Sequence, residues 1–436
     1  MTDRSHSPRP HLLLIAFYYP PSRASGVFRP LAMANHFVAH GWDVTVITTE
    51  RSFFELIDSV DASLEHLIDE RVEVERVPFA GRPWQRDVRS FSRFRGNFPT
   101  LSDKVAAWRE SAVFPDRYAP WIPGVVTAGL GIHGRHPVDV VMATGNPFAA
   151  FGAAAALGKL ASRPFVLDYR DAWTLNQFTE EPSFPADSPQ VKWERRLMSD
   201  ARRIVFVNEA QRQWHAERHP AAAERMIVVE NGFDEHMFPQ AVEPTRDDGP
   251  AVFGYVGTVT EQLPLEEFAA GWLLAREERP GITCRIHGHL GFFPNQRERI
   301  LDQLPVGDGT GVTYEGAVTK AELPRVYADL DALLMIIPSS RYVTAGKVYE
   351  YMATGLPLVT VHEPWTGARE PLRGRPGVFE VDDLSPRSVA DAIVAAADHI
   401  AASRHALRPE ARLHADAFTR SRQFEHLDEH LRAVTA

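Results

Sequence analysis

Residues 332–361 read ALLMIIPSSRYVTAGKVYEYMATGLPLVTV, and this stretch indicates the unit from which the fold is built. The runs Ala332–Ile337 and Pro357–Val361 are short, continuous and apolar, which is typical of strands buried on both faces of a parallel sheet. Between them, Lys347–Thr354 predicts a short helix that stops at Gly355, a residue suited to a helix end. The order strand, loop, helix, strand is a βαβ unit.

The same alternation runs through most of the chain. The other predicted strands are Leu12–Phe17, Asp43–Thr48, Val138–Ala143, Phe165–Asp168, Arg203–Val207, Met226–Val229, Val252–Val256, Thr283–His287, Val312–Glu315 and Gly377–Val381. The other predicted helices are Arg29–His40, Pro147–Ala161, Ala210–Arg218, Leu265–Arg279, Lys320–Leu330 and Ser385–Ala402. Because the pattern restarts after a polar segment with Pro and Gly, we expect two doubly wound α/β domains.

We expect an N-terminal domain over residues 1–239, a linker over 240–250 and a C-terminal domain that begins at residue 251. Residues 82–121 break the alternation and are rich in Arg, Trp and Phe, so we interpret them as an insertion. Two roles stay open for it. It is a solvated cover over the first domain, or it contacts an acceptor or a membrane surface through basic and amphipathic aromatic groups.

The composition of the 436 residues excludes several classes of protein. With 44% hydrophobic and 24% charged residues the chain is an ordinary globular one, and its net charge of −10 argues against sequence-blind binding of nucleic acid. A single cysteine, Cys284, cannot form an internal disulfide. Because no apolar run reaches the roughly 20 residues that span a bilayer, we expect a soluble, cytoplasmic protein. Peripheral membrane contact and the oligomeric state stay open.

Ligands of open α/β sheets bind at the carboxyl ends of the strands, so the loops there hold the candidate site residues. After the first strand, Gly26 allows close approach of a ligand, and the following helix offers an anion site at its N-terminus, near Arg29. An ordinary strand-to-helix turn explains these residues as well. After a later strand, Asn146 either bonds an acceptor or caps the helix that Pro147 begins, and we favour the cap.

The loop Asp168-Tyr-Arg-Asp-Ala-Trp173 brings two carboxylates, an Arg and a Trp to one strand end. An Asp at such a position can orient or deprotonate a hydroxyl group, and Trp173 can stack on the face of a sugar. For Asp168, a structural pair with Arg170 is an equally good explanation.

The second half of the chain offers a candidate phosphate site. Gly257 and Thr258 end a strand, where small residues can cradle a phosphate with backbone N–H groups or simply form a turn. Lys347 lies in the first turn of its predicted helix, where a cation is unfavourable with the helix dipole unless an anion also binds there. Glu350, on the same helix face, can accept bonds from a ribose diol. A surface Lys–Glu pair is the alternative.

These residues give the chain its resemblance to the GT-B glycosyltransferases, specifically the group-1, family-4-like branch. Six local patterns match in order and cover the chain from about residue 12 to its C-terminal helix. They are Phe17-Tyr-Tyr-Pro-Pro with Gly26 and Arg29, His40-Gly-Trp-Asp-Val-Thr-Val46, Asp168-Tyr-Arg-Asp-Ala-Trp173, Val229-Glu-Asn-Gly-Phe-Asp234, Gly254-Tyr-Val-Gly-Thr258 and Gly346-Lys-Val-Tyr-Glu-Tyr-Met-Ala-Thr-Gly355.

The resemblance implies two Rossmann-like domains facing a cleft, with a helix over residues 411–436 that returns from the C-terminal domain to the first one. It implies a nucleotide-sugar donor, no cofactor and no metal ligands. The acceptor is then a small molecule, a lipid-linked group or a glycan that presents a hydroxyl or an amine. Relatives mostly retain the anomeric configuration, which we carry over by analogy.

Roles for single residues follow from the resemblance. Glu350 matches the ribose-binding Glu and Lys347 a group beside the diphosphate. The remaining donor-binding candidates are Gly26, Arg29, Gly257, Thr258, Arg341, Thr344 and Gly346. Arg170 and Asp171, near the position where relatives use a His, are the catalytic candidates. The acceptor-binding candidates are Trp173 and Asn146.

The chain departs from the family at two places. Tyr342 stands where many relatives carry a Glu that touches the donor sugar, although subgroups with the Lys-x-x-Glu helix also lack it. The stretch after Gly257 lacks a common Arg and Lys, which leaves Arg29, Lys347 and Arg341 as candidate cations. A catalytically silent relative, a pseudo-glycosyltransferase and an enzyme like a sugar-nucleotide epimerase are therefore the alternatives to a glycosyltransferase.

Overall fold

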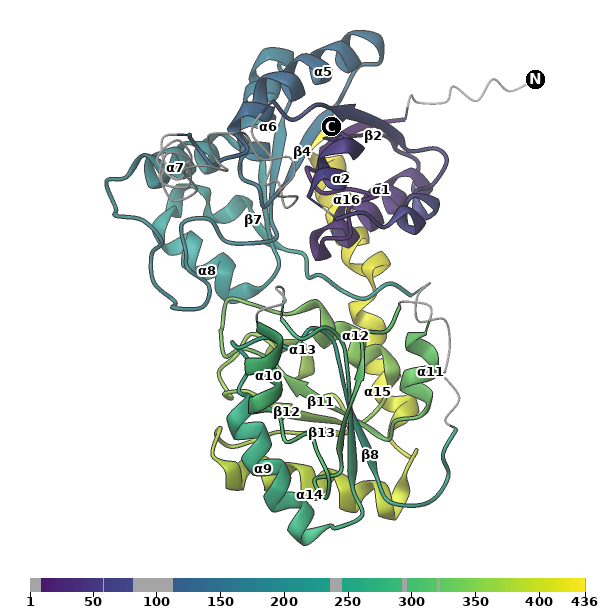
Figure 1. The fold of residues 1–436 in the computed structure, drawn as a ribbon. Coiled ribbons are helices and arrows are strands. Elements are labelled where there is room, and N and C mark those ends of the chain that lie inside the picture. The colour runs from purple at the N-terminus through teal and green to yellow at the C-terminus, as the bar shows by residue number, and fades with distance from the viewer. Residues whose placement is uncertain are drawn as a thin grey trace, which may run out of the picture. The chain divides into compact units, whose positions relative to one another are not determined.

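The computed structural model describes residues 9–57, 59–80, 113–235, 245–291, 296–319 and 322–435. Most of the predicted insertion and part of the predicted linker lie outside these residues. The chain forms two compact units, each drawn in Figure 1. Unit 1 comprises Met1–Asn176, Glu181–Glu230 and Phe424–Ala436, and unit 2 comprises Gln177–Glu180 and Asn231–Gln423.

Unit 1 is built on a seven-stranded parallel sheet with the strand order β3-β2-β1-β4-β5-β6-β7. The strands are β1 (His11–Ile15), β2 (Asp43–Thr49), β3 (Glu73–Val77), β4 (Val140–Gly145), β5 (Phe165–Tyr169), β6 (Arg203–Phe206) and β7 (Met226–Val228). The sequence prediction missed β3, since Glu73-Val-Glu-Arg-Val lies at the sheet edge and has exposed or half-buried polar side chains in place of a continuous apolar run.

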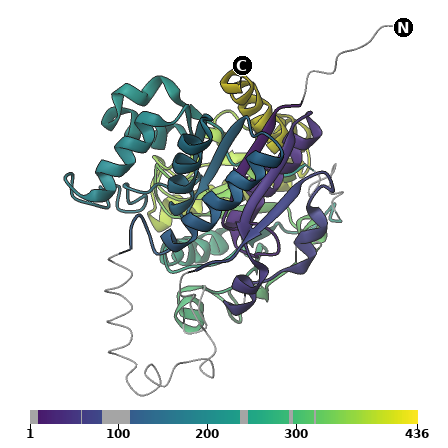
Figure 2. The ribbon, with the colours of Figure 1, turned by 90° about the horizontal axis from the view of Figure 1, so that it is seen from above.

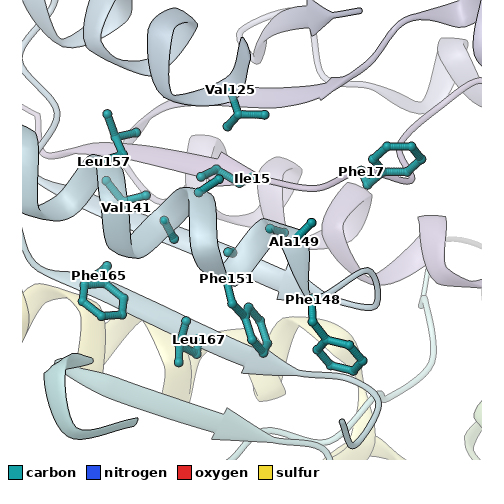
Figure 3. Close-up of a cluster of buried hydrophobic side chains, with 14 of the residues drawn as sticks. Ile15, Phe17, Val125, Val141, Phe148, Ala149, Phe151, Leu157, Phe165 and Leu167 are labelled. Atoms are coloured by element: carbon teal, nitrogen blue, oxygen red, sulfur yellow. The ribbon is translucent and has the colours of Figure 1, made fainter. Parts of the chain in front are cut away.

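Successive side chains of a strand point to opposite faces of the sheet, so these apolar strands make both faces apolar. Helices cover both faces. Leu13 and Ile15 pack under α5 (Ile122–Arg135) and α6 (Ala149–Ala161), in the cluster that Figure 3 shows. Leu12 and Leu14 pack on the other face. There they meet α1 (Phe28–Ala39) and the last part of α16 (Arg420–Thr435). In Figure 2 the strands lie between these layers. Burial of one such side chain contributes about 1.5–3 kcal/mol.

Unit 2 repeats the plan with a six-stranded parallel sheet in the order β10-β9-β8-β11-β12-β13. Its strands are β8 (Val252–Val256), β9 (Thr283–His287), β10 (Val312–Gly316), β11 (Ala332–Ile336), β12 (Leu358–Val361) and β13 (Val378–Phe379). Helices α9 (Leu265–Glu278) and α14 (Pro386–Ser403) cover one face, and α12 (Gly346–Thr354) and α11 (Leu323–Ala328) cover the other. The predicted α/β fold with two doubly wound sheets is confirmed.

The described residues form six further α-helices. They are α2 (Arg51–Leu56), α7 (Pro189–Asp200), α8 (Glu209–Arg218), α10 (Arg297–Gln303), α13 (Arg369–Leu372) and α15 (Arg408–Ala415). The predicted start of α11 at Lys320 lies outside the described residues. The predicted domain boundary near residue 240 lies there too, and the chain passes from unit 1 to unit 2 at Glu230 and Asn231.

The predicted single C-terminal helix is interrupted. It consists of α15, a 3-10 turn over Asp416–Phe418 and α16, with Thr419 extended between them. The break allows Phe233 to pair with Thr419, as its N–H donates to the carbonyl of Phe418 at 3.0 Å and its carbonyl accepts from Arg420 at 2.8 Å. Gly232, with a φ of +59°, permits this approach, because a Cβ there would lie 2.8 Å from the Phe418 oxygen.

Candidate active site

In unit 1, loops from both sides of the topological switch point meet at Arg170. The switch point lies between β1 and β4, which are neighbours in the sheet but lead into opposite halves of it. Arg170, at the end of β5, donates to the carbonyl of Gly26 at 2.7 Å and to that of Asn146 at 2.9 Å. The structure therefore brings together three loops that the sequence singled out.

Arg170 also explains the glycine at position 26. A Cβ on Gly26 would lie 1.9 Å from a guanidinium nitrogen of Arg170. The space beside Gly26, which we assigned to donor phosphates, is filled by this side chain. The carbonyl oxygen of Gly26 accepts from the same guanidinium group, so this glycine serves the packing of the loop.

Asp171 is the carboxylate that this arrangement leaves accessible. Its side chain is 41% exposed and lies 3.4 Å from a guanidinium nitrogen of Arg170. The neighbouring Asp168 is fully buried. A carboxylate held beside an arginine and open to solvent can accept a hydrogen bond from an incoming hydroxyl or amine.

Arg29 is not the accessible cation that we expected. It is buried, and it forms an ion pair with Asp168 at 2.8 Å. Its remaining N–H groups donate to the carbonyls of Glu230 and Val229, each at 3.0 Å. Asp168 thus pairs with Arg29 and not with Arg170. The pair ties α1 to the end of β5 and to the chain that leaves β7, so its role is structural.

Asn146 does not cap the helix that follows it. Helix α6 begins at Ala149, and the side chain that accepts from its first N–H is that of Asp116, at 3.0 Å. Burial raises the pKa of Asp116. Asn146 itself is exposed, so it remains a candidate for acceptor contact.

Trp173 is part of the core and not a sugar platform. Only 6% of it is exposed. Its ring stacks on Phe148 with centroids 5.3 Å apart and meets the edge of Trp193 at 5.4 Å. This packing buries the indole in the core, which does not suit the stacking on a sugar that we expected of Trp173.

In unit 2 the switch point lies between β8 and β11, and the loops after these strands carry the donor candidates. Gly257 and Thr258 follow β8, and α12 begins at Gly346 after the loop from β11. Ala345 is the N-cap of α12 and provides no side-chain hydrogen bond to the helix. The first-turn N–H groups of α12 are thus not satisfied by a capping side chain, which suits an anion site.

Lys347 connects the two halves of this site. Its ammonium group donates to the hydroxyl of Tyr255 and lies 4.2 Å from the centroid of the Tyr255 ring. A Cβ on Gly257 would lie 3.1 Å from the same nitrogen. Burial lowers the pKa of Lys347 to about 8, while the charge of Glu350 opposes that shift. The ammonium group is thus held against the turn after β8 in an environment that would favour an anion beside it.

The other donor candidates differ in their surroundings. Glu350 is half-buried one turn along α12 from Lys347. Thr344 is buried, and its hydroxyl donates to the carbonyl of Gly367 at 3.3 Å, so it holds two loops together. Arg341 is 53% exposed and forms an ion pair with Glu180 at 2.9 Å. Of the three cations expected at the diphosphate, Lys347 is the one that lies beside Gly257.

Sequence reasoning missed three residues that shape the two loop clusters. Tyr255 gave a weak signal, because it places a hydroxyl in an apolar strand immediately before Gly257. Asp116 and Glu180 gave none, since their partners Ala149 and Arg341 are far away in the sequence.

Neither a metal cluster nor a membrane-spanning helix is found among the described residues. No group of three or more His, Cys, Asp or Glu side chains is arranged there to hold a metal ion. Within the same residues, no helix combines the length and the apolar character that crossing a membrane requires.

Comparisons with known proteins agree with this architecture. Residues 28–232 match the family described as "Glycosyl transferase 4-like domain", and residues 250–399 match "Glycosyl transferases group 1". A comparison with curated protein sequences gives no match.

Solved structures share the fold at low sequence identity. HepE of Anabaena, solved with UDP and glucose, is 16% identical with a TM-score of 0.61, and the alignment covers 96% of this chain and 98% of HepE. Sucrose-phosphate synthase of Thermosynechococcus elongatus is 15% identical with a TM-score of 0.63, covering 98% and 100%. The UDP-forming α,α-trehalose-phosphate synthase of Burkholderia vietnamiensis is 14% identical with a TM-score of 0.65, covering 98% and 99%. The chain belongs to the group-1 glycosyltransferases of the GT-B fold.

Proposed function

We propose that the protein transfers a sugar from a nucleoside diphosphate sugar to a hydroxyl or amine group, with retention of configuration and without a metal ion. The observation that carries the proposal is Lys347, whose ammonium group lies against Gly257 beside the N-terminus of α12. Lys347 and the helix N-terminus would supply the positive charge that a diphosphate leaving group requires. In this proposal Glu350 accepts bonds from the ribose diol.

UDP is the nucleotide we propose to test first, because HepE was solved with UDP. Our proposal assigns the donor to unit 2 and the acceptor to the Arg170 loop cluster of unit 1. Asp171 would receive the hydrogen bond of the acceptor hydroxyl or amine and orient it for attack. The protein would act without a further cofactor, since the donor is itself a substrate.

The proposed step is balanced by the substrates themselves. The acceptor oxygen or nitrogen forms a bond to the anomeric carbon while the bond from that carbon to the phosphate oxygen breaks. The electron pair goes to the phosphate oxygen. The acceptor proton leaves its hydrogen bond to Asp171 as the new bond forms, and the phosphate oxygen receives it on the same face of the sugar. Positive charge from Lys347 would stabilise the departing diphosphate before the proton arrives.

Gly346→Ala tests the donor site with little risk to folding. A Cβ at Gly346 would meet no atom within 4 Å in the described part of the chain, and alanine is the better helix former. The added methyl would instead occupy the space in front of α12 where a phosphate must approach. We expect the variant to keep its melting temperature and to lose about tenfold or more in UDP affinity.

The matched control is Gly134→Ala, at a helical glycine of unit 1 that also has free space around its Cβ position. It should bind UDP as the wild type does. Unchanged UDP affinity in Gly346→Ala and in Lys347→Ala would overturn the donor assignment. A thermal-shift comparison of UDP-, GDP- and dTDP-sugars would then identify the nucleotide, since a ligand of the native state raises its stability.

A further inference from the structure

Trp365 is exposed, whereas the other tryptophans that the structure describes are buried or partly buried. Its exposed fraction is 47%, compared with 6% for Trp173 and none for Trp272. Trp365 lies in the loop that follows β12 in unit 2. A partly exposed tryptophan offers both an apolar ring and a polar N–H group, and tryptophan is enriched at interfaces for this reason.

The loop that carries Trp365 is fixed to the loop that precedes α12. The N–H of Gly367 donates to the carbonyl of Ser340 at 2.9 Å, and the N–H of Glu363 donates to the hydroxyl of Ser339 at 3.2 Å. A Cβ on Gly367 would lie 2.7 Å from the backbone oxygen of Arg341, so the two backbones are in close contact. Backbone and side-chain hydrogen bonds therefore hold in place the loop that carries the indole.

Arg341 lies over the ring of Trp365 and is itself held by Glu180. The guanidinium carbon of Arg341 lies 5.6 Å from the centroid of the Trp365 ring. Glu180 holds Arg341 twice, because its carboxylate accepts from the side chain at 2.9 Å and from the backbone N–H at 3.2 Å. Arg341 remains 53% exposed and Glu180 22% exposed, so both can still meet a ligand.

This combination matches the chemistry of a sugar ring. A pyranose has an apolar face of C–H groups, which packs on an aromatic ring, and a rim of hydroxyls, which bond with guanidinium and carboxylate groups. An aromatic or lipid aglycone would pack on the indole but would offer no hydroxyl groups to bond with Arg341 and Glu180. The loop that carries Arg341 leads into α12, where we place the donor phosphates.

We propose that Trp365, Arg341 and Glu180 form a platform that binds a pyranose ring. The inference rests on the proposed function and specifies the substrate at the same site. The ring is either the sugar of the donor or a sugar of the acceptor, since the platform recognises the chemistry they share. Either source makes Trp365 the residue that takes the stacking role which the sequence suggested for Trp173.

The direct test is fluorine NMR of the full chain labelled with 5-fluorotryptophan. The resonance of Trp365 is identified by its loss in Trp365→Phe. It is then followed during separate titrations with UDP, UDP-glucose and UDP-galactose. Further titrations use the methyl glycosides of glucose, galactose and mannose, each as the monosaccharide and as a disaccharide. A shift with UDP-sugars beyond that with UDP indicates the donor sugar, and a shift with free glycosides indicates an acceptor sugar. A resonance that no sugar shifts would overturn the platform.

Affinities of variants provide the second readout. Trp365→Ala should weaken binding of the sugar ligand by about threefold to tenfold, which is the range for one aromatic contact, and should leave UDP affinity unchanged. Leu273→Ala, at a residue of unit 2 that is 45% exposed, is the matched control. It should change neither the affinity for the sugar ligand nor the affinity for UDP. An equal loss for UDP and UDP-sugar in Trp365→Ala would contradict the platform. UDP binding by the wild type tests the proposed function separately.

Discussion

The ammonium nitrogen of Lys347 lies 4.2 Å from the centroid of the Tyr255 ring and donates a hydrogen bond to the Tyr255 hydroxyl. The same hydroxyl donates to the carbonyl of Thr258 at 2.9 Å. Tyr255 is buried, so one residue of β8 holds both the lysine and the turn that we propose to meet the diphosphate.

Tyr255→Phe should therefore weaken donor binding without unfolding the protein. The substitution keeps the ring and its contact with Lys347 but removes two hydrogen bonds, each worth about 0.5–1.5 kcal/mol. We expect the dissociation constant of UDP, measured by calorimetry, to rise about threefold to tenfold. Tyr314→Phe is the control, since the hydroxyl of Tyr314 donates to the carbonyl of Gly288 at 2.8 Å instead. An equal loss of affinity in both variants would contradict a specific role for Tyr255.

The affinity for UDP should depend on pH through Lys347. Burial lowers the pKa of this lysine to about 8, so its ammonium form is progressively lost as the pH rises above that value. A diphosphate binds the ammonium form, hence donor binding should draw in a proton and weaken by up to about tenfold for each pH unit above about 8. Calorimetry in buffers of different ionisation enthalpy measures this uptake. In Lys347→Met the uptake should disappear, and uptake that persists would assign it to another group.

The same pKa shift has a consequence for stability in the absence of ligand. The folded state binds the lysine proton less tightly than the unfolded state, in which the pKa is near its ordinary value of 10.5. Between about pH 8 and about pH 10.5 the unfolded state therefore holds more protons, and stability should rise with pH in this window through Lys347. The difference between the melting temperatures of wild type and Lys347→Met, followed across the window, isolates this contribution. A difference that does not change with pH would contradict the shift.

Local patterns in the sequence predicted most of the fold. The runs of β8 and β9 are continuous, apolar and bounded by turns, and their predicted limits Val252–Val256 and Thr283–His287 coincide with the structure. The interrupted C-terminal helix was not predictable in this way. Thr419 is extended where its backbone pairs with Phe233, and no pattern in the sequence around Thr419 indicates a partner so distant in the chain.

The candidate site was harder to predict because side chains of the same type have different roles. A buried arginine and an accessible one look alike in a sequence, and only the ion pair with Asp168 shows that Arg29 is structural. Trp173 and Trp365 both follow predicted strands, yet their surroundings differ. Trp173 stacks on Phe148 and is buried, whereas Trp365 is half-exposed. Lys347 was identified because a cation in the first turn of a helix is itself unusual.

The buried ion pair between Arg29 and Asp168 should contribute to stability and not to donor binding. Asp168→Ala leaves the guanidinium group of Arg29 buried without its carboxylate, which costs about 3–5 kcal/mol in comparable cases. We expect a lower melting temperature and unchanged UDP affinity in the variant that remains folded. The double variant Arg29→Met with Asp168→Leu should recover part of the lost stability, because no unpaired charge remains. A selective loss of UDP affinity at full stability would return Arg29 to the donor site.

Asp171→Asn should lower turnover and leave the donor bound. Its carboxylate is the accessible acid beside Arg170, and our proposal has it receive a hydrogen bond from the acceptor. An amide of the same size keeps the shape of the loop but accepts a weaker hydrogen bond, so the acceptor would be oriented less well and release of UDP from a UDP-sugar should slow by about a hundredfold. UDP affinity and the melting temperature should match those of the wild type. Asp187→Asn changes the charge of unit 1 by the same amount at an exposed position and should not affect UDP release. If Asp171→Asn releases UDP at the wild-type rate, the carboxylate of Asp171 takes no part in the reaction. Arg170 would then be the remaining catalytic candidate of this loop.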